Sequence, residues 1–196
     1  MLLRKNIVNQ RVQNIAIKRA RPITEALIPL LDNINGKILD YGSGLGHIGL
    51  LISEYTNTNV EYVDVRKYPF THPDVNITIF NGKILPYSTR EFDVSIAIFV
   101  LHHVPNPRKS LEEMARVSER NLIICEDLIK SRGEFFIEMI KDSIVNCFIP
   151  HMTLQYKIES DWEEIFSDLG LNVQKKIYFE SRYIFKFKHV AWLLEI

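Results

Sequence analysis

The chain is poor in cysteine and carries no net charge. Cys125 and Cys147 are its two cysteines, and they stand far apart without the paired spacing of a metal site. This argues against a disulfide-stapled secreted fold and predicts two free thiols in a reducing cytoplasm, with no metal. Lysine plus arginine equals aspartate plus glutamate, at 24 each. Overall charge therefore points to neither nucleic acid nor an acidic membrane as partner.

Long apolar runs are also missing. The longest stretches, such as Val94 to Leu101, are far shorter than the roughly 18–20 residues that a membrane helix needs. The start, MLLRKNIVNQRVQ, becomes polar after three residues and does not resemble a signal peptide. We therefore expect a cytoplasmic protein without a membrane span.

The first 24 residues contain basic side chains and no acidic ones. A nucleic-acid or phosphate contact is one interpretation, and a solvated helix face is the more common one. Nucleic acid remains open as a partner on this evidence alone. The basic residues are Arg4, Lys5, Arg11, Lys18, Arg19 and Arg21.

Two regions differ in their hydrophobic pattern. Residues 1–35 have helical spacing, with a new start near Pro22 and a kink or second start expected at Pro29. Residues 36–196 alternate short apolar runs with helical segments, which predicts a doubly wound α/β domain. The expected strands are 37–41, 60–65, 75–80, 92–98, 121–126, 172–180 and 182–194, and the expected helices 46–55, 107–118, 133–148 and 160–169. The short link at Ser181 predicts an antiparallel hairpin at the end.

A glycine-rich loop follows the first apolar strand, in Lys37-Ile-Leu-Asp-Tyr-Gly-Ser-Gly-Leu-Gly-His-Ile-Gly49. Glycines there permit a tight turn and the close approach of a ligand at the carboxyl edge of the sheet. A dinucleotide fingerprint requires its third glycine at position 47, which is histidine here. Asp40 would also repel a pyrophosphate, whereas it suits a cationic amino acid. Spacing and charge both disfavour an NAD-dependent oxidoreductase.

Several segments together resemble class I S-adenosylmethionine-dependent methyltransferases. The subgroup with the most similar pattern contains small-molecule methyltransferases of quinone biosynthesis. The resemblance is clear over about residues 36–128. The segments are Asp40-x-Gly42-x-Gly44-x-Gly46, Asp64 after the second strand, Ile84-Leu-Pro-Tyr-Ser-Thr-Arg-Glu-Phe-Asp-Val94, Phe99-Val-Leu-His-His-Val-Pro-Asn106 and Leu111-Glu-Glu-Met-Ala-Arg-Val117.

This resemblance implies a Rossmann-like, doubly wound, seven-stranded mixed sheet with a C-terminal antiparallel hairpin strand, and helix 1–35 over the cofactor cleft. It implies S-adenosylmethionine as cofactor, with Asp64 accepting hydrogen bonds from the ribose hydroxyls. Asn81 replaces the family's usual acid near the adenine, and its carbonyl could still accept a hydrogen bond. The implied cofactor-binding residues are Asp40, Gly42, Gly44, Gly46, Asp64, Asn81, Gly82 and Phe99.

The predicted activity is methyl transfer to a small-molecule acceptor that the sequence does not identify. An inactive methyltransferase-like binding or scaffold subunit is the alternative, for which Asn81 is the hint. A hydroxyl or cationic amine acceptor would need a base to take its proton. No residue stands out as that base. The weak candidates are His102, His103, Glu126, Asp127 and His151.

Overall fold

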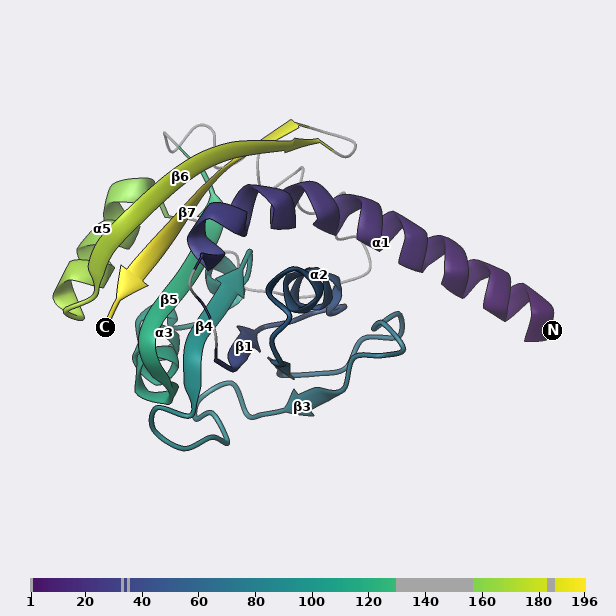
Figure 1. Ribbon diagram of the computed structural model, residues 1–196, viewed down its shortest axis with the longest axis horizontal. Helices are drawn as coiled ribbons and strands as arrows, with labels where there is room; N and C mark the ends of the chain where they lie inside the picture. The colour runs from purple at the N-terminus through teal and green to yellow at the C-terminus, as the bar shows by residue number, and fades with distance from the viewer. Residues whose placement is uncertain (1, 33, 35, 130–156, 183–185) are drawn as a thin grey trace.

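A twisted sheet forms the centre of the molecule (Figure 1). The computed structural model describes residues 2–32, 34, 36–129, 157–182 and 186–196, with side chains from residue 10 onward. The sheet has seven strands in the order β3-β2-β1-β4-β5-β7-β6. They are β1 (Ile38–Tyr41), β2 (Val60–Asp64), β3 (Ile77–Ile79), β4 (Phe92–Ile98), β5 (Ser118–Asp127), β6 (Asn172–Arg182) and β7 (Lys186–Glu195).

The strands from β3 to β5 run parallel, and β7 is antiparallel to both of its neighbours. The predicted α/β fold with a C-terminal antiparallel hairpin strand is therefore confirmed. Strand order reverses between β1 and β4, and open α/β sheets bind ligands at that point, beyond the carboxyl ends of the strands.

Helices cover both faces of the sheet. Helices α1 (Leu2–Leu31) and α2 (His47–Thr56) pack on one face, where Leu27 and Ile52 meet Ile38 and Ile123. Helices α3 (Pro107–Val117) and α5 (Glu159–Asp168) pack on the other, where Leu111 joins the second core. This double cover explains why β1 is buried at every position. A short 3-10 turn, η1 (Leu101–His103), follows β4.

The C-terminal end of helix α1 lies in the body of the molecule, and the helix extends away from the body toward its N-terminus (Figure 1). Pro22 and Pro29 both lie inside this single helix, so the expected new start near Pro22 and the expected second start at Pro29 are both wrong. Leu27, Leu30 and Leu31 are buried around Pro29, and this packing against the sheet holds the last turn despite the lost backbone donor. None of the helices in the described part of the chain combines the length and apolarity that crossing a bilayer requires.

The hairpin connection differs from the expected one. Ser181 lies within β6 and pairs with Phe187, so the link at Ser181 is wrong and the ladder continues to Arg182 opposite Lys186. Cross-strand pairing with β7, rather than the residue type, places Ser181 within the strand. The predicted helix 133–148 lies outside the described residues, as does Cys147. Cys125 is buried and free, as predicted.

Candidate functional site

The glycine loop joins β1 to α2 at the point where strand order reverses. Gly42, Gly44 and Gly46 have φ values of 70°, 58° and 80°. These are left-handed conformations, which glycine adopts without the steric cost that a side chain brings. The Gly42 and Ser43 N–H groups donate to the Val63 carbonyl at 2.8 and 3.1 Å, which ties the loop to the end of β2.

The three glycines differ in what surrounds them. A Cβ at Gly42 would lie 2.1 Å from Val100 Cγ2, and one at Gly46 would lie 2.6 Å from Val75 Cγ1. A Cβ at Gly44 would meet nothing closer than the Gly42 carbonyl, at 4.0 Å. Packing within the protein therefore requires the outer two glycines, whereas Gly44 faces open space that a ligand could fill.

Asp64 ends β2 beside this open space. Its Oδ2 accepts the Gly44 N–H at 2.9 Å, and its Oδ1 accepts the Val65 N–H at 2.7 Å. Burial raises the pKa of this carboxyl, and the backbone donors of Gly44, Arg66 and Val65 offset part of the rise. The sequence-predicted pair Gly44 and Asp64 is thus brought into direct contact.

Asp40 is buried in β1 and faces α2. Its Oδ2 lies close to Gly49, since a Cβ there would stand 2.5 Å away, and the Gly49 N–H donates to the carboxylate. Burial and the nearby Asp64 raise the pKa of Asp40 to about 7. Near pH 7, neutral and ionised forms of Asp40 therefore coexist beneath the loop. Its direct contact with a cofactor stays a prediction.

Asn81 and Gly82 follow β3, next to the end of β2. The Phe80 N–H donates to the Asp64 carbonyl at 3.1 Å, so the two strand ends lie together. Asn81 is exposed, and its Oδ1 accepts the backbone N–H groups of Lys83 and Ile84 at 2.9 and 3.1 Å. The side-chain carbonyl expected to face adenine therefore already accepts two hydrogen bonds within a turn, and its role toward a cofactor stays a prediction.

Phe99 follows β4 with a φ of 56°, which is unusual for a bulky side chain. Such outliers persist where the surroundings hold them, and they cluster at functional sites. The Phe99 N–H donates to the Cys125 carbonyl at 2.8 Å, which fixes this turn to β5. Its neighbour Val100 packs against Gly42, so the exit of β4 and the glycine loop form one continuous surface.

His102 and Glu126 form a buried pair on the α3 side of the sheet. His102 Nδ1 hydrogen-bonds Glu126 Oε2, and Glu126 Oε1 accepts the Leu101 N–H at 2.8 Å. Both side chains are 2% exposed. This pair fastens η1 to the end of β5. This structural contact explains the positions of His102 and Glu126, two of the candidate bases, without requiring a role toward a substrate.

The His103 ring lies against His102, with ring centroids 3.9 Å apart and the two planes tilted by 49°. Burial and the neighbouring His102 lower the pKa of His103 to about 3, against a raising effect of Asp127. Its ring is therefore neutral near pH 7, and its buried Nδ1 has no hydrogen-bond partner among the described residues. His151 lies outside them.

Asp127 has a partner that sequence reasoning missed. Its Oδ1 lies 2.9 Å from Nδ1 of His189, which is buried in β7. A single histidine directly before the apolar run Val190-Ala191-Trp192 is the signal that could have drawn attention to it. A second missed contact joins α1 to α2, where Gln13 Oε1 lies 2.6 Å from His47 Nε2, next to Gly46.

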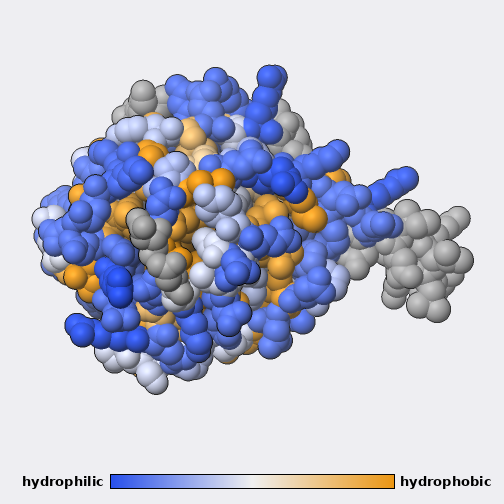
Figure 2. Space-filling view, in the orientation of Figure 1, coloured by the Kyte–Doolittle hydropathy of each residue, from blue (hydrophilic) through white to orange (hydrophobic). Residues whose placement is uncertain are grey.

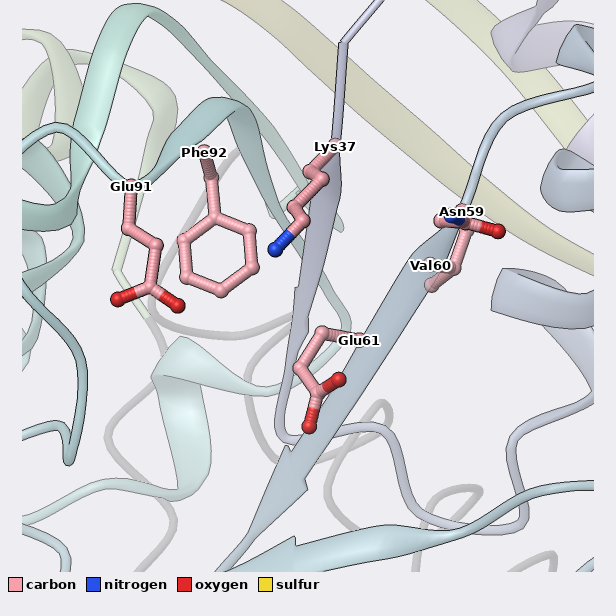
Figure 3. Close-up of a pocket in the computed structure, with 6 residues that line it drawn as sticks. All are labelled: Lys37, Asn59, Val60, Glu61, Glu91 and Phe92. Carbon is pink, nitrogen blue, oxygen red and sulfur yellow. The ribbon is translucent and has the colours of Figure 1, made fainter.

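A hollow of about 380 Å³ opens at the opposite edge of the sheet (Figure 3). Lys37, Glu61 and Glu91 lie around it, at or beside the amino ends of β1, β2 and β4. It therefore stands apart from the glycine loop, which follows the carboxyl end of β1.

The face in Figure 2 is mostly hydrophilic, with hydrophobic areas toward its middle. Among the described residues, no group of histidine, cysteine and acidic side chains is arranged to hold a metal ion.

The predicted cofactor residues thus share one edge of the sheet. Ser43 Oγ, within the glycine loop, is buried without a hydrogen-bond partner among the described residues. A buried polar atom of this kind calls for an explanation such as a ligand or water. Together with the open space at Gly44, it makes this edge fit a polar ligand.

Comparison with known proteins agrees with this arrangement. A family model described as a methyltransferase domain matches residues 13–176. The uncharacterised methyltransferase YcgJ of Bacillus subtilis is 25% identical over 150 residues, which cover 67% of this chain and 55% of that protein. The chain thus spans about half the length of this curated relative.

Solved structures show the same fold. A methyltransferase of Thermotoga maritima, described as a possible histamine N-methyltransferase, superposes with a TM-score of 0.68 at 14% identity, covering 97% of this chain and 96% of that one. The magnesium protoporphyrin IX methyltransferase of Synechocystis, solved with S-adenosylhomocysteine, gives a TM-score of 0.64 at 14% identity, covering 95% and 86%.

The family model spans most of the chain, including the glycine loop, Asp64 and the exit of β4. The resemblance seen in the residues is confirmed, and with it S-adenosylmethionine as the cofactor of this class. The chain belongs to the methyltransferase domain family.

Proposed function

We propose that the protein transfers a methyl group from S-adenosylmethionine to a small-molecule acceptor. The observation that carries this proposal is the pairing of Gly44 with Asp64. The buried Asp64 carboxylate lies 2.9 Å from the backbone nitrogen of Gly44, and the Gly44 α-carbon faces open space. A ribose with two adjacent hydroxyls suits such an acceptor, because both can donate to one carboxylate.

The residues along this edge have distinct roles in the proposal. Asp64 accepts the ribose hydroxyls, Ser43 Oγ and the backbone at Gly44 contact the amino-acid part, and Asp40 lies beneath the loop, beside Gly49. Asn81 and Gly82 line the adenine side. The bound cofactor supplies a methyl group activated by its sulfonium. The protein holds and orients the two reactants, which provides most of the acceleration.

Two observations support a small-molecule acceptor. The chain has equal numbers of acidic and basic residues, so it lacks the overall positive charge that nucleic-acid substrates favour. Two proteins with the same fold have names that refer to histamine and to a porphyrin, which are small molecules. The alternative of an inactive scaffold subunit has Asn81 as its only support, and that side chain forms a turn.

Thermal denaturation tests the cofactor. S-adenosylhomocysteine should raise the melting temperature, whereas NAD should not, because only a ligand of the native state stabilises it. Asp64→Ala should weaken binding in calorimetric titration by about 1.5–3 kcal/mol, the range for hydrogen bonds to charged groups. A folded Asp64→Ala variant with unchanged affinity would refute the ribose assignment.

A second experiment addresses the acceptor. The protein is incubated with radioactive-methyl S-adenosylmethionine and a cell extract, which is then separated into small-molecule, protein and RNA fractions. We expect label in the small-molecule fraction. Label confined to RNA or protein would overturn the acceptor class, and no label above a heat-treated control would favour the scaffold alternative.

A further inference from the structure

Three polar side chains from three neighbouring strands form a chain of hydrogen bonds. Asp127 Oδ1 on β5 lies 2.9 Å from His189 Nδ1 on β7, and His189 Nε2 lies 2.6 Å from Ser181 Oγ on β6. A carboxylate only accepts, so Nδ1 carries the proton that it receives. In the neutral imidazole Nε2 is then the acceptor, and the Ser181 hydroxyl donates to it. We call Asp127, His189 and Ser181 the relay.

The relay lies among aromatic rings. His189 is 3% exposed, and its ring centroid lies 4.6 Å from Phe99 and 4.9 Å from Phe179. Phe187 stacks nearly parallel to it at 6.3 Å. Ser181 is half-buried and lies at the outer end of this chain of hydrogen bonds. Few water molecules reach the imidazole, and the order carboxylate, imidazole, hydroxyl is the one that activates a hydroxyl in nucleophilic catalysis.

The position of the relay connects it with the cofactor loop. Asp127 is the last residue of β5, at the carboxyl edge of the sheet, and Phe99 follows the adjacent strand β4. Phe99 contacts His189, while the next residue, Val100, packs against Gly42. An acceptor could therefore lie between the glycine loop and the relay.

We propose that Asp127, His189 and Ser181 remove the proton from a hydroxyl group of an aromatic or otherwise apolar methyl acceptor. This inference rests on the proposed function and assigns its acceptor class. The surrounding phenylalanines provide an apolar surface for the body of such a molecule, and the oxygen lone pairs of Ser181 accept its hydroxyl.

The step balances without a further reactant. The acceptor oxygen forms a bond to the methyl carbon, and the carbon–sulfur bond of the sulfonium donor breaks with its electron pair on sulfur. The acceptor proton passes to Ser181 Oγ as the original Ser181 proton passes to His189 Nε2. The imidazolium that results pairs with the Asp127 carboxylate and later loses its proton to water.

A fluorophosphonate probe tests whether the relay activates Ser181, independently of acceptor and cofactor. Ser181 Oγ forms a bond to phosphorus, the phosphorus–fluorine bond breaks with its electrons on fluoride, and His189 takes the hydroxyl proton. We expect labelling at Ser181 in the wild type, located by peptide mass spectrometry. His189→Gln and Asp127→Asn should each slow it about 100-fold or more, the scale of general-base catalysis.

Ser167, an exposed serine in α5, is the matched control, and Ser167→Ala should not change labelling of Ser181.

Two results would overturn the proposal. One is labelling of wild-type Ser181 no faster than that of Ser167, which needs no variant to fold. The other is wild-type labelling in a His189→Gln protein with native circular dichroism. Binding of S-adenosylhomocysteine, measured on the same samples, separates this failure from that of the proposed function.

Discussion

Gly44 and Gly170 differ in only one respect that matters to a ligand. Both have positive φ, at 58° and 73°, and neither has an atom closer than 4.0 Å to the place of a Cβ. Valine at either position carries backbone strain of about 1–2 kcal/mol or more. Only at Gly44, beside Asp64, would the new side chain also enter the proposed cofactor space.

Gly44→Val should therefore lower S-adenosylhomocysteine affinity by about 100-fold or more, where each tenfold corresponds to about 1.4 kcal/mol. Gly170→Val should lose similar stability yet bind normally. Calorimetric titration of both variants measures this. Equal affinities would show that the glycine loop does not hold the cofactor.

Asp40 gives the protein a pH-dependent stability. Its pKa is raised to about 7, mainly by burial and then by Asp64. A raised carboxyl pKa stabilises the fold at acidic pH, below the unfolded value, and this contribution is lost as pH rises through 7. Asp40→Asn keeps an oxygen for the Gly49 N–H and removes the titration.

Between pH 5 and pH 8 the wild type should lose up to about 3 kcal/mol more unfolding free energy than Asp40→Asn. Urea denaturation at the two pH values measures the difference. Because Asp64 raises the Asp40 pKa, the difference reports on the coupled pair of carboxyls. Parallel pH dependence of the two proteins would show that Asp40 is ionised throughout.

Among the elements, α1 is fastened to the glycine-loop helix by Gln13. Gln13 Oε1 lies 2.6 Å from His47 Nε2, and Gln13 Nε2 donates to the Phe70 carbonyl at 3.1 Å. His47 is buried, and burial together with His72 lowers its pKa to about 4, so the ring is neutral and Nε2 donates. Gln13 thereby bridges α1, α2 and the loop after β2.

Gln13→Ala should cost about 1–3 kcal/mol, because it leaves the His47 N–H buried without its acceptor. Gln10→Ala, at an exposed position of the same helix, should change stability little. Urea denaturation compares the two. If the variants were equally stable, the helix would be held by its apolar contacts alone.

The extent to which elements could be predicted depended on burial. The strand expected at 92–98 coincides with β4 because its nearly continuous apolar run reflects cover on both faces. The hairpin link was misplaced because two β-like stretches were divided at Ser181, although cross-strand pairing with Phe187 decides its state. Propensity yields to such tertiary contacts.

The same distinction holds for the site. The glycines, Asp64 and Phe99 could be proposed from the sequence because the motif is local or follows a strand directly. His189 escaped notice because its partner Asp127 is 62 residues away in sequence. Strand order and register brought the two together, and neither can be read from spacing.

At the scale of the whole molecule, the two hydrophobic cores share the central strands. Leu122 and Ile124 of β5 point to the α3–α5 side, while Ile123 and Cys125 point to the α1–α2 side. Both tryptophans, Trp162 in α5 and Trp192 in β7, are buried in the former. Loss of either core would expose the strands that support the other.

Unfolding should therefore be a single cooperative transition. Tryptophan fluorescence reports on the α5 side, and far-ultraviolet circular dichroism reports on all helices, including α1. The urea midpoints of the two signals should coincide. Separate midpoints would mean that residues 1–35 form an independent unit, as the predicted division at residue 36 allows.

The two borders of the sheet determine how the protein behaves among its own copies. An unpaired strand border invites another chain to add itself, which leads to aggregation. The β3 border is only three residues long. The β6 border carries Lys175, Lys176, Glu180 and Arg182, and Lys175 Nζ is bonded to the Pro29 carbonyl at the end of α1. The shortness of β3 and the charges on β6 both oppose edge-to-edge pairing between copies of the protein. We therefore expect concentrated solutions of the protein to remain free of fibres formed through its sheet.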